Sequence, residues 1–238
     1  MLTIGSLVAG VAGIAIFGIF LFLADYFQLI KGYSPVTCGL AFLPMFGCIL
    51  VSSNTSSIVT LPRFGPRVLI TIGMVLAGGA MVYLAQLTPA SSYAGGVLPS
   101  LLVLGLGFGM IIAPAINTAT AGVSREDSGV ASALVNTMQQ VGGSIGTSAL
   151  STIALTATAS YLGAHHAGRS AEAVAATHGY TVAFAVSAGL LGLGAVLAIV
   201  LLPSKLRLQQ LREAASASSA APSGAAAAVQ PDSASSTA

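Results

Sequence analysis

The chain has 238 residues, of which 55% are hydrophobic and 6% are charged, and its formal net charge is +2. Soluble domains carry about 25% charged residues, so this chain has too few ionic groups to cover a surface that faces water. The composition excludes an ordinary soluble globular protein and indicates that a large apolar area faces lipid. No basic stripe suggests nucleic acid as a partner.

Long stretches without ionised side chains define the predicted membrane spans. The segment between Arg67 and Arg125 contains no charged residue. It is too long for one span of about 20 residues and suits two spans joined by the turn-forming segment 88–96. The apolar runs are continuous rather than alternating, which favours an all-α membrane protein over a barrel. The six predicted transmembrane helices cover about residues 4–30, 39–61, 68–87, 97–121, 129–157 and 179–202.

The first predicted span carries Asp25, the one acidic residue inside any predicted span. A carboxylate in lipid is costly, so Asp25 is expected to be paired, protonated or in a water-filled cavity. Two interpretations stay open. Asp25 is either a proton-coupling or cation-binding group, or an acid close to the external interface, since Lys31 follows six residues later. Residues 1–24 contain no Lys or Arg, which argues against a cleavable signal peptide.

The second and fifth predicted spans contain amide side chains. Hydroxyl groups in the segment 52–57 can bond to carbonyls of their own helix, whereas the amide of Asn54 is less easily hidden. Asn136 and Gln140 of the fifth span share one helix face at i, i+4. These amides are expected either to bond between helices or to line a wet cavity. With Asp25 and Gln28, they form the candidate proton or substrate site.

Small residues in the fourth and fifth spans predict close helix packing. Gly105 and Gly109 are one helical turn apart, as are Gly142 and Gly146, and this spacing lets helix backbones approach closely. The glycines around Gly105 lie inside a span, which excludes a nucleotide-binding loop. Pro114, after this glycine run, is the candidate for a functional bend.

The spans contain no nucleophile–base set and no metal-binding cluster, so no enzyme, cofactor or metal is expected. The longest external loop, predicted at 160–178, holds His165, His166 and His178 without the fixed spacing of a metal site. Cys38 and Cys48 are about 15 Å apart along a helix, too far for a disulfide.

The distribution of basic residues predicts the orientation. Both termini share one side with six basic residues, against two on the other side, Lys31 and Arg169. The positive-inside rule places the side of the termini in the cytoplasm. Residues 1–203 are predicted to form the six-helix domain and residues 204–238 a cytoplasmic tail, mostly disordered because it is rich in Ala and Ser.

Several segments together resemble a known family. Residues 28–35 and 39–44, with the sequences QLIKGYSP and GLAFLP, resemble the start of the C-terminal half of fourteen-helix drug:proton antiporters of the major facilitator superfamily. The turn holding Arg63, Gly65 and Arg67 resembles a degenerate copy of the family's cytoplasmic loop, without its acidic residue. Residues 136–146 resemble the next-to-last helix, although Gln139 stands where the family often has Arg. The resemblance covers about residues 15–202.

The resemblance implies a half-transporter in the plasma membrane, built from two inverted three-helix repeats. It implies proton-coupled multidrug efflux of small apolar or cationic compounds, including antibiotics, by alternating access between two six-helix halves. The expected partners are the lipid bilayer, a small-molecule substrate, and a missing N-terminal half or a second copy. The alternative is a membrane remnant or scaffold subunit that does not transport.

Overall fold

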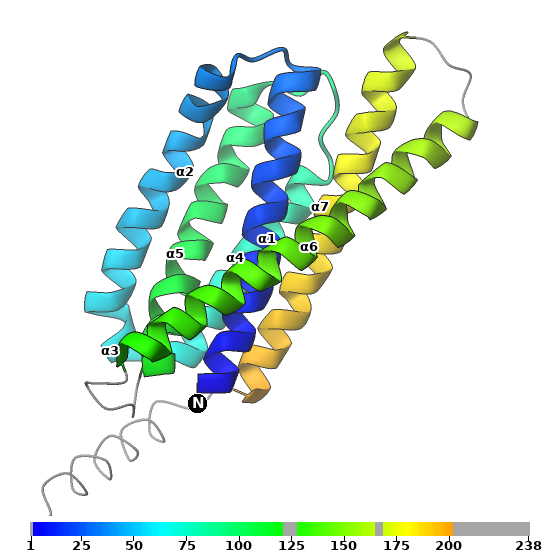
Figure 1. Ribbon diagram of the computed structural model, residues 1–238. Helices are drawn as coiled ribbons and strands as arrows, with labels where there is room; N and C mark the ends of the chain where they lie inside the picture. The colour runs from blue at the N-terminus through cyan, green and yellow to red at the C-terminus, as the bar shows by residue number, and fades with distance from the viewer. Residues whose placement is uncertain (1, 121–127, 165–168, 202–238) are drawn as a thin grey trace, which may run out of the picture.

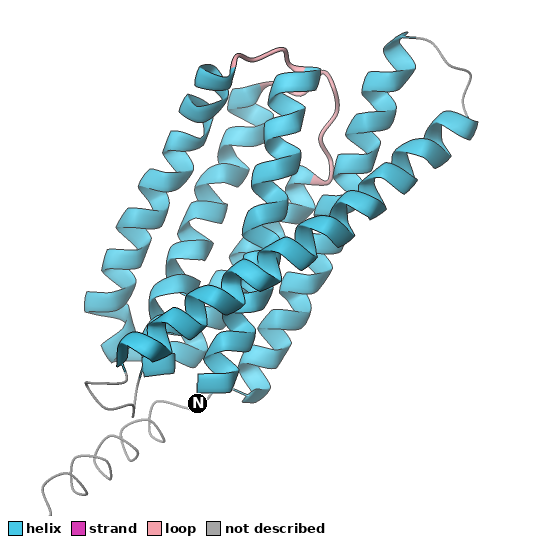
Figure 2. Cartoon of the chain, viewed as in Figure 1, coloured by secondary structure: helices cyan, strands magenta, loops and turns pink. Residues whose placement is uncertain are grey.

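A computed structural model describes residues 2–120, 128–164 and 169–201, and no strand occurs in these three ranges (Figure 2). The predicted tail 204–238 lies outside the described residues. Helices run lengthwise past one another and form a bundle (Figure 1). The predicted all-α membrane fold is confirmed.

The described helices follow the predicted spans with shifted ends. Three short π-helical segments, η1 to η3, extend the α-helices where a bundle end is reached. The elements in chain order are α1 (Leu2–Asp25), η1 (Tyr26–Ile30), α2 (Pro35–Thr55), η2 (Ser56–Thr60), α3 (Leu61–Phe64), α4 (Pro66–Leu84), η3 (Tyr93–Val97), α5 (Leu98–Thr120), α6 (Ser128–Ala164) and α7 (Arg169–Leu201). One end of the bundle holds α3, and we call it the α3 end; the other holds residues 31–34 and 85–92, and we call it the loop end (Figure 1).

The predicted loop at 160–178 is wrong in most of its length. Helix α6 continues to Ala164 and α7 already begins at Arg169. The segment 171–177 is rich in Ala, the strongest helix former, so local propensity favours the extended start of α7. The two helices project past the rest of the bundle at the loop end (Figure 1).

Helix α6 differs from its neighbours in polarity. Among the described residues, five segments are long and apolar enough to cross a membrane, within α1–η1, α2–η2, α4, η3–α5 and α7. Helix α6 is long enough, with 37 residues, but its Ser, Thr, Asn and Gln residues lower its hydropathy. The sequence analysis predicted six membrane spans of equal standing. In the structure, α6 has the length of a span but a lower hydropathy than the other five segments.

The turns at the two bundle ends depend on glycine and proline. Gly65 has φ of +80° between α3 and α4, a backbone conformation that favours glycine, and Pro66 begins α4. At the loop end Gly32 has φ of +68°, and Ser34 caps α2 by accepting a 3.2 Å hydrogen bond from the Thr37 backbone N–H. These local signals fix where the chain reverses.

Helix contacts repeat between the two halves of the chain. The first unit is α1, α2 and α4, and the second is α5, α6 and α7. Exchanging the units maps the α1–α6 contact onto α5–α2 and the α4–α5 contact onto α7–α1, and all four pairs are in contact. These four contacts agree with two three-helix repeats, whereas the contact between α6 and α7 has no comparable counterpart between α2 and α4.

Candidate functional site

Asp25 is the last residue of α1, at the point where the chain changes to the π-helical turn η1. Its side chain is half-buried. Among the described residues, none donates a hydrogen bond to it or forms an ion pair with it. The structure therefore places a carboxyl group without a described ionic or hydrogen-bond partner at the junction of α1 and η1.

Lys31 is held away from Asp25. Its Nζ donates a 2.8 Å hydrogen bond to the Pro89 carbonyl and lies 5.8 Å from the centre of the Tyr26 ring. The buried Tyr26 hydroxyl donates a 2.7 Å hydrogen bond to the Thr88 carbonyl. These contacts tie the segment after α1 to the loop after α4. Lys31 therefore binds a carbonyl rather than the nearby acid.

The predicted site residues separate into two groups. Gln28 is exposed near Asp25 at the loop end, with its Nε2 atom 3.9 Å from the Cys38 Sγ. Asn54 is exposed near the α3 end and donates a 2.8 Å hydrogen bond to the Leu50 carbonyl of its own helix. At about 1.5 Å per residue, Asn54 lies roughly 28 Å from the start of α2 at Pro35. Asp25 and Asn54 therefore do not share a site.

Asn136 and Gln140 lie on the exposed side of α6. The backbone of Gln139, between these two amides, packs against Gly13 of α1. The amides therefore lie at about the level of Gly13 along α1. Asp25 lies roughly 18 Å from Gly13 along α1, at about 1.5 Å per residue. The two amides are therefore separate from the carboxylate at the loop end.

The amides begin a longer row of polar side chains that the sequence analysis missed. Every fourth residue along the exposed side of α6 is polar, and we call this set the polar stripe: Asn136, Gln140, Ser144, Ser148, Thr152 and Thr156. The Ser148, Thr152 and Thr156 hydroxyls donate to the carbonyls four residues earlier, at 2.9, 3.0 and 2.7 Å. The four-residue spacing of these polar residues is visible in the sequence and indicates the stripe.

The opposite side of α6 packs on α1 through glycine. A Cβ atom on Gly142 would meet the backbone of Gly10, and one on Gly146 would meet the side chain of Ile14. Gly10 and Gly13, which lie three residues apart on α1, were not among the predicted packing residues. Helix α6 thus has one side against α1 and one polar side without a described partner.

The second pair of predicted packing glycines lies between α5 and α2. A Cβ atom on Gly105 would lie 2.5 Å from the Met45 carbonyl oxygen, and one on Gly109 would lie 2.8 Å from that of Ile49. The Ser52 hydroxyl, which is buried, donates a 2.7 Å hydrogen bond to the Leu106 carbonyl across this contact. Pro114 is also buried, and α5 continues past it to Thr120.

The turn at the α3 end carries the predicted basic pair. Arg63 is exposed at the end of α3, and Arg67 is half-buried in the first turn of α4. Gly65 between them allows the sharp reversal described above. In the described residues, no group of three His, Cys, Asp or Glu side chains is placed to hold a metal ion. His178 contacts the Tyr161 ring, with centroids 5.1 Å apart, and His165 and His166 lie outside the described residues.

The repeat pattern and the apolar helices define a multi-pass helical membrane protein. Residues 2–147 match the family model of the Major Facilitator Superfamily. The chain belongs to this superfamily, which confirms the family that the sequence motifs predict.

Antibiotic resistance and export proteins are among its relatives. The chain is 42% identical over 218 residues to the puromycin resistance protein pur8 of Streptomyces alboniger, covering 91% of this chain and 43% of the relative. It is 33% identical to the cephamycin export protein CmcT of Amycolatopsis lactamdurans, over 63% of this chain and 31% of the relative. It is 32% identical to the multidrug efflux pump LfrA of Mycolicibacterium smegmatis, over 59% of this chain and 27% of the relative. The chain therefore spans less than half the length of these relatives.

Proposed function

We propose that this chain acts as one six-helix half of an exporter of small apolar or cationic compounds, including antibiotics. A second six-helix half completes the transport pathway, and the two halves alternate between inward-open and outward-open states. The relatives named for puromycin resistance, cephamycin export and multidrug efflux support the substrate class.

The polar stripe is the observation that carries this proposal. Its six side chains are exposed along a helix of 37 residues, whereas the exposed side chains of α1, α2, α4, α5 and α7 include many large apolar ones. The hydroxyl groups of the stripe donate hydrogen bonds to carbonyls of their own helix. The amide groups of Asn136 and Gln140 have further donors and acceptors that can bind a partner. Leaving such a group without a partner in an apolar medium costs several kcal/mol. A water-filled pathway or a facing helix removes this cost, and a second half provides both.

The proposed coupling ion is the proton, and the proposed coupling group is Asp25. A carboxylate inside a membrane protein that lacks an ion-pair partner is stable when protonated or hydrated, so it can alternate between these states as access changes. Among the described residues none forms an ion pair with Asp25, and Lys31 bonds to Pro89 instead. These contacts support a titrating role over a fixed interfacial pair.

The proposed orientation places both termini and the α3 end in the cytoplasm. Six basic residues lie on that side of the predicted topology and two on the other. Single cysteines at Arg63 and at Ser92, in a background without Cys38 and Cys48, test this placement with an impermeant maleimide on intact cells. We expect labelling at position 92 and protection at position 63. The reverse pattern would contradict the orientation.

An efflux assay tests the exporter proposal. Cells that lack their main drug exporters would produce this chain alone, or with the N-terminal half of the puromycin resistance relative, and would be loaded with ethidium or exposed to puromycin. We expect drug efflux when the chain has an N-terminal half, and loss of efflux when Asn136 and Gln140 are both changed to Leu. Efflux from the chain alone would identify a second copy as the partner. No efflux from either combination, with both proteins present in the membrane, would favour the non-transporting scaffold.

A further inference from the structure

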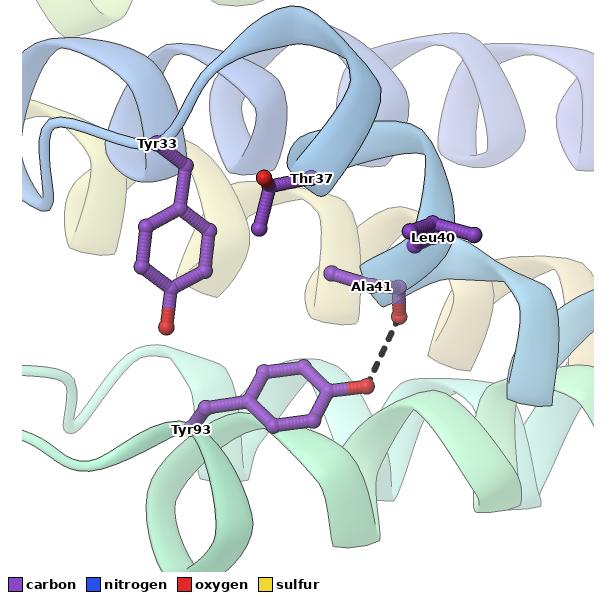
Figure 3. Close-up of a pocket in the computed structure, with 5 residues that line it drawn as sticks. All are labelled: Tyr33, Thr37, Leu40, Ala41 and Tyr93. Atoms are coloured by element: carbon purple, nitrogen blue, oxygen red, sulfur yellow. Dashed lines mark hydrogen bonds between the residues drawn. The ribbon is translucent and has the colours of Figure 1, made fainter.

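A cavity of about 270 Å³ opens at the loop end of the bundle, away from the polar stripe. Figure 3 shows the five residues that line it, and we call it the tyrosine pocket: Tyr33, Thr37, Leu40, Ala41 and Tyr93. They come from the loop after η1, the first turns of α2 and the start of η3. The pocket therefore joins the two three-helix units at the loop end.

The aromatic walls of the tyrosine pocket are held in place by the protein itself. The Tyr93 hydroxyl donates a 2.8 Å hydrogen bond to the Ala41 carbonyl, drawn as a dashed line in Figure 3. Phe27 stacks on Tyr33 with ring centroids 5.4 Å apart and an interplanar angle of 9°, and its centroid lies 6.0 Å from that of Tyr93. Walls that are already ordered lose little entropy when a ligand binds.

One polar group of the pocket has binding capacity left. No described residue forms a hydrogen bond with the Tyr33 hydroxyl, which points toward the side of the pocket that holds Tyr93 (Figure 3). The Thr37 hydroxyl is already 2.9 Å from the Ser34 hydroxyl. A phenolic O–H can both donate and accept, so a single hydrogen bond from the ligand would satisfy it.

Charge and size narrow the ligand class. None of the five lining residues is charged, and the nearby Lys31 is bonded to the Pro89 carbonyl, so the pocket gives neither an anion nor a cation an ionic partner. Its volume is slightly below the roughly 300–1,000 Å³ of sites for drug-sized ligands. We infer that the tyrosine pocket binds a neutral, planar aromatic molecule of one or two rings whose single polar group bonds to the Tyr33 hydroxyl. This site goes beyond the proposed transport pathway and needs no transport to be detected.

The test uses the purified full chain in nanodiscs of zwitterionic lipid, with the fluorescent probe 2-naphthol and empty nanodiscs as the partition blank. Two variants address the pocket: Tyr33→Phe removes the free hydroxyl, and Thr37→Phe fills the cavity from an exposed position. Their matched controls are Tyr161→Phe on α6 and Thr71→Phe on α4, both outside the pocket. Circular dichroism and size-exclusion profiles check that each variant is folded.

We expect saturable 2-naphthol binding by the wild type and by both controls. Tyr33→Phe should weaken it about three- to tenfold, the contribution of one neutral hydrogen bond. The same variant should bind 2-methylnaphthalene as the wild type does, because that probe cannot form the hydrogen bond. Thr37→Phe should remove saturable binding of both probes.

Three results would overturn the proposal. One is binding by Thr37→Phe equal to that of Thr71→Phe. The second is an equal effect of Tyr33→Phe on both naphthalene probes, because the hydroxyl would then play no specific part. The third is tighter saturable binding of benzyltrimethylammonium than of 2-naphthol, which would make the pocket a cation site built on aromatic faces.

Discussion

Replacing Gly142 with Ala should separate α1 from α6. The added Cβ atom would lie 2.8 Å from the Gly10 Cα and 2.9 Å from its carbonyl carbon, whereas ordinary contact begins at 3.4 Å. The two helices must therefore move apart by at least about 0.6 Å, because backbone atoms cannot rotate away as a side chain can. A radial gap of this size forfeits a quarter or more of each dispersion contact along the crossing.

Gly189→Ala on α7 is the matched control. Gly189 lies inside a helix and a Cβ atom there would meet nothing within 4 Å. Both substitutions gain similar helix propensity, so the difference between them isolates the steric term. Overpacking of this kind costs about 1–3 kcal/mol, which corresponds to a difference of roughly 2–12 °C in melting temperature for a chain of this size.

The assay is thermal unfolding of all variants in the same detergent. The measured quantity is the fraction of protein that remains monodisperse after heating. We expect Gly142→Ala to melt below the wild type, and Gly189→Ala to melt at or above it. If Gly142→Ala were as stable as Gly189→Ala, the close α1–α6 crossing would be wrong, and with it the view that the polar stripe faces away from the bundle.

Three further predictions follow from single positions. Gly65→Ala should lower the free energy of unfolding by about 1–2 kcal/mol, because φ of +80° is strained for a residue with a Cβ. Gly79→Ala is the control, because a Cβ atom there meets nothing within 4 Å, and thermal unfolding measures both variants. Tyr26→Phe should cost about 1–3 kcal/mol, because the Thr88 carbonyl loses its 2.7 Å hydrogen bond. A cost equal to that of Tyr33→Phe, which removes a hydroxyl with no hydrogen bond to a described residue, would refute this role. In the assembled exporter, Asp25→Asn should abolish ethidium efflux driven by a proton gradient in membrane vesicles, while the control Glu172→Gln should retain it. Unchanged efflux by the Asp25 variant would refute the proposed coupling role.

The bundle could be predicted from the sequence because lipid imposes a simple rule. Every long run without charge has to be helical, so the fold class follows from the positions of the charges. The loop at 160–178 was wrong because composition marks where a helix leaves lipid and not where it ends. Helix α6 continues to Ala164, and local propensity favours the start of α7 at Arg169.

The candidate site was less predictable because it depends on depth and on facing. Asp25 and Asn54 are both polar residues within spans, and the predicted topology already puts Asp25 near the external side and Asn54 nearer the cytoplasmic side. Grouping them in one candidate site did not use this difference in depth. The spacing of Gly105 and Gly109 predicted a close contact, but its partners Met45 and Ile49 belong to another helix and come only from tertiary packing. The polar stripe was visible in the sequence as a four-residue period, and its exposure required the position of α1.

The modest hydropathy of α6 bears on how the chain is made. A ribosome delivers the helices one by one, and the translocon releases a segment sideways into the membrane according to its apolar content. Helix α6 is the described long helix that falls short on this measure, and α1, whose glycines receive it, has been synthesised more than a hundred residues earlier. We therefore expect the insertion of α6 into the bilayer to depend on packing against α1, which the ribosome has already delivered.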